Sequence, residues 1–245
     1  MKVRRAASRL FRSMLDFALP PRCGGCGAIV DDVDSFCTDC WRKLEFLQGG
    51  CARCGLPLKG TDAETCAACL ARPPRLDRIR AAVGYGDISR SIALRLKYGR
   101  KTALARTMSR YMRPLIGDLP ADALLVPVPL HRRRLWSRGF NQSAIVAREL
   151  SRRTGVPVAV DALKRVRPTP PLKGMGMRQR RRTVAGVFRA NAARMIRGRT
   201  IVLIDDVLTT GSTANACARV LKRAGAARVD LISWARVIRP IQVDV

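Results

Sequence analysis

The chain has 245 residues, and 47% of them are hydrophobic. This suits one ordinary domain with a sizeable core plus a small additional module. No apolar run approaches the roughly 20 residues of a spanning helix, and Arg12 and Asp16 interrupt the only apolar stretch near the N-terminus. We therefore expect no secretory signal, no transmembrane segment and a cytoplasmic location.

The net charge of +29 would attract polyanions whatever the fold. Two explanations stay open, namely a surface that binds nucleic acid, or compositional drift toward Arg with well-solvated faces. The chain holds only three Trp, three Tyr and six Phe, so no aromatic platform for stacking single-stranded bases is evident.

Residues 1–21 predict a short amphipathic helix that packs on its own protein or, alternatively, contacts a membrane or DNA. Arginines lie largely opposite its apolar face, and two prolines end it. The apolar residues at helical spacing are Leu10, Met14, Leu15 and Ala18.

Residues 22–74 predict a zinc-binding module built as a repeat. Eight of the nine cysteines form four C-x-x-C pairs, which in a cytosolic chain indicate zinc rather than disulfides. Sequential pairing assigns one ion to Cys23, Cys26, Cys37 and Cys40, and another to Cys51, Cys54, Cys66 and Cys69. Spacing alone leaves interleaved pairing open. Four thiolates leave no position for a metal-bound water, so the role is structural or one of recognition.

Residues 75–245 predict an α/β domain, because short strands alternate with helices. Such parallel sheets bind ligands at the carboxyl ends of their strands. The ninth cysteine, Cys217, is expected to be a small core residue. The predicted strands are 79–85, 123–128, 200–204 and 229–235, and the predicted helices are 89–97, 102–115, 143–154 and 213–224.

The segment Ile201–Thr213 carries the strongest functional indication. A buried strand ends in Asp205 and Asp206, and Thr-Thr-Gly-Ser-Thr then leads into a helix. Glycine, hydroxyls and a helix N-terminus suit a phosphate, whereas the carboxylates suit sugar hydroxyls or a metal ion. A ribose 5-phosphate satisfies both, and the alternative is a capped helix after a core strand.

This segment resembles the phosphoribosyl pyrophosphate (PRPP) signature of type I phosphoribosyltransferases. Together with Val126–Leu130, Arg138–Gln142 and the double zinc ribbon, it resembles the ComF family over nearly the whole chain. The resemblance implies a type I phosphoribosyltransferase-like parallel sheet flanked by helices, an activity on PRPP with Mg²⁺, and a role in DNA uptake.

The resemblance also implies the site residues. Asp205 and Asp206 would be catalytic and hold the ribose hydroxyls, and a second loop would face pyrophosphate. The remaining PRPP-binding residues would be Val207, Leu208, Thr209, Thr210, Gly211, Ser212, Thr213, Pro129, Leu130, His131 and Arg132. Further residues that would line the site are Lys97, Arg138, Asn141, Gln142, Lys173 and Arg178.

The segment Pro168–Arg182 predicts a long mobile loop that would act as a lid or, as a solvated basic run, do nothing specific. Leu172 and Thr183 depart from the family, where Gln and Asn often stand. His131 lies beside arginines that favour its neutral form, so it is expected to be an ordinary loop residue that contacts an anion at most.

Two classes of function remain. One is a phosphoribosyltransferase of nucleotide metabolism that joins a small acceptor to PRPP. The other is a protein of DNA uptake that handles single-stranded DNA, with DNA-uptake proteins as partners, and holds PRPP in the same pocket. No segment resembles a purine- or orotate-binding hood, which favours the second class. Acceptor, turnover and oligomeric state are left open by the sequence.

Overall fold

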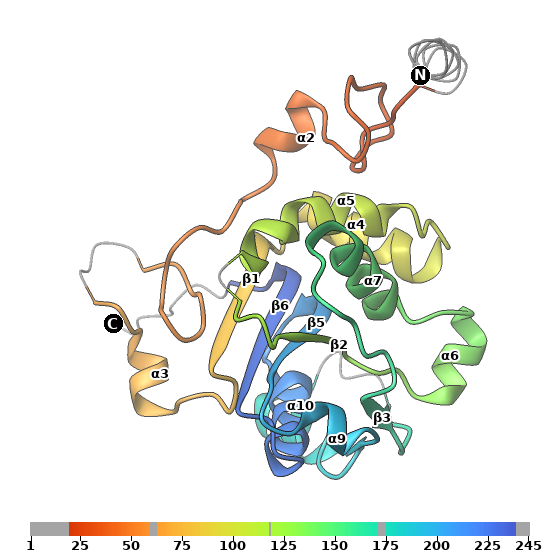
Figure 1. Cartoon of the computed structure of the whole chain (residues 1–245). Coiled ribbons are helices and arrows are strands. Elements are labelled where there is room, and N and C mark those ends of the chain that lie inside the picture. The colour runs from red at the N-terminus through yellow and green to blue at the C-terminus, as the bar shows by residue number, and fades with distance from the viewer. Residues whose placement is uncertain (1–19, 59–62, 118, 171–174, 239–245) are drawn as a thin grey trace, which may run out of the picture.

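Four parallel strands form the central sheet within the described residues of the computed structural model, which are 20–58, 63–117, 119–170 and 175–238. Their order is β1-β6-β5-β2 (Figure 1), and Ile201 of β5 lies between Leu124 and Val229. The strands are β1 (Arg78–Gly84), β2 (Leu124–Pro127), β5 (Thr200–Leu208) and β6 (Arg228–Arg236). The helix predicted within residues 1–21 lies outside the described residues except for Pro20 and Pro21.

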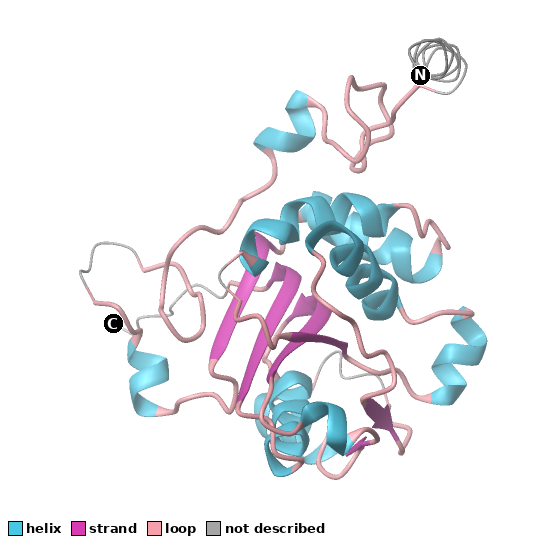
Figure 2. Ribbon diagram, viewed as in Figure 1, coloured by secondary structure: helices cyan, strands magenta, loops and turns pink. Residues whose placement is uncertain are grey.

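Helices flank the magenta sheet (Figure 2), as the α/β prediction requires. Those that follow β1 and β2 are α4 (Asp87–Tyr98), α5 (Leu104–Met112), the 3₁₀ turn η1 (Arg113–Ile116), α6 (Arg132–Arg138) and α7 (Gln142–Thr154). Those nearer the C-terminus are α8 (Met177–Thr183), α9 (Ala193–Ile196) and α10 (Ser212–Arg223). The cysteine-rich part holds α2 (Thr38–Arg42) and α3 (Ala67–Ala71). No helix in the described part of the chain is both long and apolar enough to cross a bilayer.

The core lies on both faces of the sheet, because successive strand residues point to opposite sides. Ile201 and Leu203 pack with α10, whereas Val202 and Ile204 pack with α4, α5 and α7. All four side chains are fully buried. This explains the uninterrupted apolar run that the sequence shows at this strand.

An antiparallel pair, β3 (Leu163–Arg165) and β4 (Phe188–Ala190), stands apart from the main sheet. The segment Pro168–Arg182 connects these two strands. It is not the unbroken loop that we predicted, because α8 begins inside it. No sequence pattern distinguished this short arginine-rich helix from a solvated run.

The predicted elements of the main sheet are confirmed, with differences at the ends of some of them. The strand predicted to end at Ile204 continues as β5 to Leu208, so the two aspartates lie within it. Ser89 does not begin α4; it occupies the third position, and its hydroxyl accepts a hydrogen bond from Gly86 N at 2.9 Å. Helix α6 was not predicted, and Cys217 is buried in the core as expected.

Candidate ribose-phosphate site

The turn between β5 and α10 forms a small pocket at the carboxyl end of the sheet. Gly211 adopts a left-handed conformation (φ +70°), and its carbonyl accepts a hydrogen bond from Asn215 N at 2.8 Å. The hydroxyls of Thr210 and Ser212 lie 2.9 Å apart. The pocket is small and partly open to solvent, with a cavity volume of about 40 Å³, and it is lined by Asp205 and residues 207–214. Hydroxyls, backbone amides and a helix N-terminus are the donors that bind phosphate.

The two aspartates at the end of β5 have different surroundings. Asp206 is buried, forms an ion pair with Lys97 Nζ, and lies 3.5 Å from Gln142 Nε2. Asp205 accepts hydrogen bonds from Ser143 Oγ at 3.3 Å and from Asp206 N at 2.9 Å. Asp206 is therefore held by a cation, whereas Asp205 lines the pocket.

These surroundings shift the pKa values of Asp205 and Lys97. Burial and the neighbouring Asp206 carboxylate raise the pKa of Asp205 to about 7. For Lys97, burial opposes the charged form, but the attraction of Asp206 outweighs it and raises the pKa. The site thus carries a carboxyl group with a pKa near neutrality next to the ion pair of Lys97 and Asp206.

Three elements that are distant in sequence converge on the aspartates. Lys97 comes from the end of α4, Gln142 and Ser143 from the first turn of α7, and the aspartates from β5. Arg138 Nη1 donates to Gln142 Oε1 at 2.6 Å. Lys97, Arg138 and Gln142 were named from the sequence, and the structure brings them together around Asp206. Ser143 was missed, although its position one residue after Gln142 was the available indication.

The loop after β2 is fixed by hydrogen bonds rather than by a regular element. Asn141 Nδ2 donates to the carbonyl of Val128 at 3.1 Å, and Asn141 Oδ1 caps α7 by accepting from Ser143 N at 3.1 Å. His131 is buried and caps α6 by accepting from Arg133 N at 3.3 Å. It is therefore a capping residue, which we had not predicted.

The neutral form of His131 suits this capping bond. Burial and the charges of Arg132 and Arg133 lower the pKa of His131. Pro129, Leu130 and Arg132 complete the loop between β2 and α6. Only a neutral imidazole nitrogen accepts a hydrogen bond, so this arrangement agrees with the ionisation expected from the sequence.

In the described part of the arginine-rich segment, Arg180 contacts the phosphate turn. Arg180 Nη1 on α8 donates to Thr209 Oγ1 at 3.0 Å. Arg178, which the resemblance suggested as lining the site, is exposed two residues earlier on the same helix. Lys173 and Leu172 lie outside the described residues. Thr183 donates within α8, to the carbonyl of Gln179 at 2.9 Å.

The cysteines form two compact groups that match the sequential pairing. We call Cys23–Cys40 the first ribbon and Cys51–Cys69 the second ribbon. Within each group all four sulfur atoms lie within 4.8 Å of one another. Neighbouring sulfurs are 3.6 Å apart in the first ribbon and 3.7 Å in the second. Zn–S bonds of about 2.3 Å require tetrahedral edges of about 3.8 Å, so both groups fit zinc.

Backbone amides support the thiolates in the same way in both ribbons. Cys37 N donates to Cys23 Sγ, and Cys66 N donates to Cys51 Sγ, each at 3.3 Å. Burial raises the pKa of Cys23, but such amide bonds outweigh it and lower the value to about 6. In these two four-cysteine zinc-binding sites every coordination position is a thiolate, so no position is left for a metal-bound water.

Comparison with known proteins defines the class of this chain. A double zinc ribbon model matches residues 14–70, and a phosphoribosyl transferase model matches residues 137–240. The protein thus joins a double zinc ribbon to a phosphoribosyl transferase domain. It belongs to the ComF family, as its curated relatives show.

Those relatives match along most of their length. The DNA utilization protein YhgH of Escherichia coli K12 is 32% identical over 209 residues, covering 82% of this chain and 90% of that protein. Competence protein F of Haemophilus influenzae is 28% identical, covering 88% and 96%. Competence protein ComFC of Bacillus subtilis is 26% identical, covering 79% and 80%.

Solved structures show a weaker likeness. Adenine phosphoribosyltransferase of Thermoanaerobacter pseudethanolicus has a TM-score of 0.37 and 14% identity, covering 56% of this chain and 82% of that one. Glutamine PRPP amidotransferase of B. subtilis has a TM-score of 0.36 and 21% identity, covering 52% and 26%. At these scores the likeness carries no argument about individual residues.

Proposed function

We propose that this ComF-family protein binds PRPP with Mg²⁺ at the turn between β5 and α10 and acts in the uptake of DNA. The main observation behind the proposal is that Asp205 and the turn of residues 207–214, which offers phosphate-binding donors, line the same pocket. The 5-phosphate would rest on the amides and hydroxyls of Thr209–Thr213. The ribose hydroxyls would donate to the carboxylates of Asp205 and Asp206.

The contacts of Asp206 limit how a metal is held. One of its oxygens pairs with Lys97, and the other faces Gln142. Mg²⁺ is commonly held by one or two carboxylates together with phosphate oxygens of the substrate. Here the ligand's pyrophosphate would supply most of the oxygen atoms, and Asp205 is the protein carboxylate with room to contribute. The metal's part is to neutralise the leaving pyrophosphate.

If the bound PRPP turns over, the chain's own residues act by positioning and charge. As pyrophosphate leaves, positive charge develops on the ribose, and the two carboxylates are placed to stabilise it. Arg180 already touches the phosphate turn and would cover the ligand from α8. We place the protein in the cytoplasm, because zinc sites built from thiolates suit a reducing compartment.

Ligand binding should depend on pH through Asp205. With a pKa of about 7, this carboxyl is mostly neutral at pH 6 and mostly ionised at pH 8. Because the ionised form is the better acceptor for the diol, PRPP affinity should rise roughly tenfold over this interval. Calorimetry at several pH values measures this, and Asp205→Asn serves as the control for titration of the ligand itself. A pH dependence unchanged in Asp205→Asn would contradict the assignment.

The alternative function is a phosphoribosyltransferase of nucleotide metabolism acting on a small acceptor. The phosphoribosyl transferase match favours it. Release of pyrophosphate from PRPP with a panel of nucleobases, and separately with single-stranded DNA, distinguishes the two. Release that persists in the variants Asp205→Asn and Asp206→Asn would reject the assigned site for both.

A further inference from the structure

Helix α6 contributes nothing to either core, because none of its seven residues is buried. Its ends explain why it forms: His131 caps the start, and Gly139 ends it in a left-handed conformation (φ +83°) with its amide bonded to Leu135 O at 2.7 Å. The helix is therefore fixed by its caps rather than by core packing. Of its side chains, Arg134 donates to Thr169 O at 3.2 Å, whereas Arg132, Arg133 and Trp136 are exposed. Figure 1 shows α6 at the periphery of the fold.

The side chains of α6 combine one aromatic ring with four guanidinium groups. Trp136 is 88% exposed, the highest value for any large apolar side chain among the described residues. The arginines of this helix are Arg132, Arg133, Arg134 and Arg138. An indole ring that stays in water forgoes the few kcal/mol of stabilising free energy that its burial would provide. Packing of the core therefore does not explain a tryptophan at this position.

A second exposed ring lies between α6 and the acidic pair. Tyr98, at the end of α4, is 73% exposed, and the Arg138 guanidinium lies 5.2 Å from its ring centre. Arg138 also bonds Gln142, which faces Asp206, while Lys97 next to Tyr98 pairs with Asp206 directly. Tyr98 and Arg138 therefore connect helix α6 to the residues that contact Asp206.

This combination is the chemistry that binds unpaired bases. Aromatic faces stack bases of any sequence, and guanidinium groups neutralise the phosphates between them. In a duplex the base faces are covered by their neighbours, so exposed rings have nothing to stack on. The low aromatic content of the sequence argued against such a platform, but two rings suffice when both are exposed beside clustered arginines.

We propose that a stacking surface, formed by Tyr98, Arg132, Arg133, Arg134, Trp136 and Arg138, binds single-stranded nucleic acid. Bases stack on Trp136 and Tyr98, and phosphates contact the arginines. The proposal rests on the proposed function in that it gives the role in DNA uptake a location, and it places the strand beside the bound ribose. A membrane surface is the competing partner, since it also accepts tryptophan and arginine.

The experiment measures anisotropy of a labelled 15-nucleotide single strand with the full-length, zinc-loaded protein. Trp136→Ala should weaken binding roughly fivefold or more, whereas Trp136→Phe should keep it within about twofold because the ring is retained. Trp136 fluorescence should be quenched by the strand, and this quenching should be absent in Trp136→Phe. A duplex of the same sequence should be insensitive to Trp136→Ala. Matched deoxy- and ribo-oligonucleotides decide between DNA and RNA.

A matched charge control separates this surface from the general basic field. Arg133→Ala should lower the slope of log affinity against log salt by about 0.7, whereas Arg223→Ala on α10 should leave it unchanged. Equal affinity of Trp136→Ala and wild type, or a Trp136 response to anionic vesicles but not to oligonucleotide, would overturn the proposal. PRPP calorimetry on Trp136→Ala is expected to match wild type. If the wild-type protein does not bind PRPP, the proposed function is wrong, but the result for single-strand binding is unaffected.

Discussion

The two zinc ribbons have nearly the same cysteine spacing, yet they lie against opposite faces of the sheet. Cys23 and Cys40 of the first ribbon join the core formed with α4, α5 and α7. All four cysteines of the second ribbon join the core on the α10 face. In the first ribbon Cys26 is exposed, whereas in the second ribbon every cysteine is buried.

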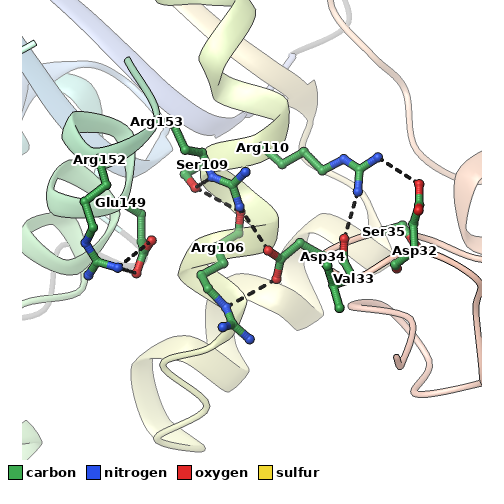
Figure 3. A network of polar contacts seen from close by, with 10 residues as sticks. All are labelled: Asp32, Val33, Asp34, Ser35, Arg106, Ser109, Arg110, Glu149, Arg152 and Arg153. Atoms are coloured by element: carbon green, nitrogen blue, oxygen red, sulfur yellow. Dashed lines mark hydrogen bonds and ion pairs between the residues drawn. The ribbon is translucent and has the colours of Figure 1, made fainter. Parts of the chain in front are cut away.

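The contacts of the first ribbon are mostly charged and aromatic. Asp34 pairs with Arg153 at 2.9 Å and with Arg106 at 3.4 Å, as Figure 3 shows. Arg110 donates to Val33 O at 2.8 Å in the same network, and the ring of Phe36 stacks on Tyr111 with centres 5.0 Å apart. This docking depends on side chains that water and salt can reach.

The backbone carbonyls of the second ribbon accept hydrogen bonds from residues of β1 and β6. Ile79 N donates to Arg53 O at 2.7 Å, and Arg80 Nη2 donates to Ala52 O at 3.0 Å. Arg236, at the end of β6, bonds the carbonyl of Cys54. One sequence motif therefore serves two structural purposes: the first ribbon is attached to the domain, and the second ribbon is part of its core.

Replacing equivalent cysteines should produce the largest difference in stability between variants of the two ribbons. Cys54→Ser removes a buried ligand, so we expect loss of one zinc and a destabilisation of more than about 5 kcal/mol, because metal binding and core packing are lost together. Cys26→Ser should also lose one zinc but leave the phosphoribosyltransferase part folded. Zinc content and thermal unfolding measure both. Equal destabilisation would contradict the distinction.

The glycines that follow these cysteines give a finer test. Gly27 (φ +87°) and Gly55 (φ +65°) are both left-handed, so alanine costs about 1 kcal/mol at either position. A Cβ at Gly55 would also lie 2.6 Å from Ile79 O, whereas at Gly27 it would meet nothing within 4 Å. Denaturant unfolding should show Gly55→Ala to be about 1–3 kcal/mol worse than Gly27→Ala. Identical unfolding curves for the two variants would mean that Gly55 does not pack closely against Ile79 of β1.

The smallest expected effect is a salt-dependent change in the free energy of unfolding, and only the first ribbon should show it. Asp34→Asn keeps a residue that tolerates the observed φ of +60° but removes the charge shared by Arg106 and Arg153. We expect a loss of about 1–2 kcal/mol at low salt that shrinks at high salt. The exposed Asp31→Asn is the control and should change stability by less than about 0.5 kcal/mol. A salt-independent loss would exclude a charge effect.

Local patterns predicted much of this molecule. Paired cysteines identified the zinc ligands, and the apolar run Ile201–Ile204 identified the central strand, because each signal lies within a few residues. The docking of the ribbons was not predictable, since it depends on Asp34 meeting Arg153, which is 119 positions later. Helix α6 was missed because it has no apolar face, and periodicity is the main evidence for a helix in sequence.

The residues of the candidate site also fall into two groups, those that local sequence predicted and those that it did not. Asp205, Asp206 and the turn that follows stand together in sequence, so their chemistry could be inferred directly. Lys97, Arg138 and Gln142 were named only through resemblance to a family. Tyr98 belongs to the segment Lys97–Gly99, which the same resemblance suggested as lining the site. Ser143 was not named as a site residue, because only the packing of α7 on the sheet brings it to Asp205. Their roles in binding remain predictions.

The central claim is that PRPP binds where the aspartates meet the phosphate turn. Isothermal titration of zinc-replete protein with PRPP and Mg²⁺ tests it directly, with Asp205→Asn/Asp206→Asn as the matched variant that keeps the size of both side chains. We predict saturable binding at one PRPP per chain that is lost in the double variant. Absence of heat in the folded wild type, or equal binding by the double variant, would contradict the claim.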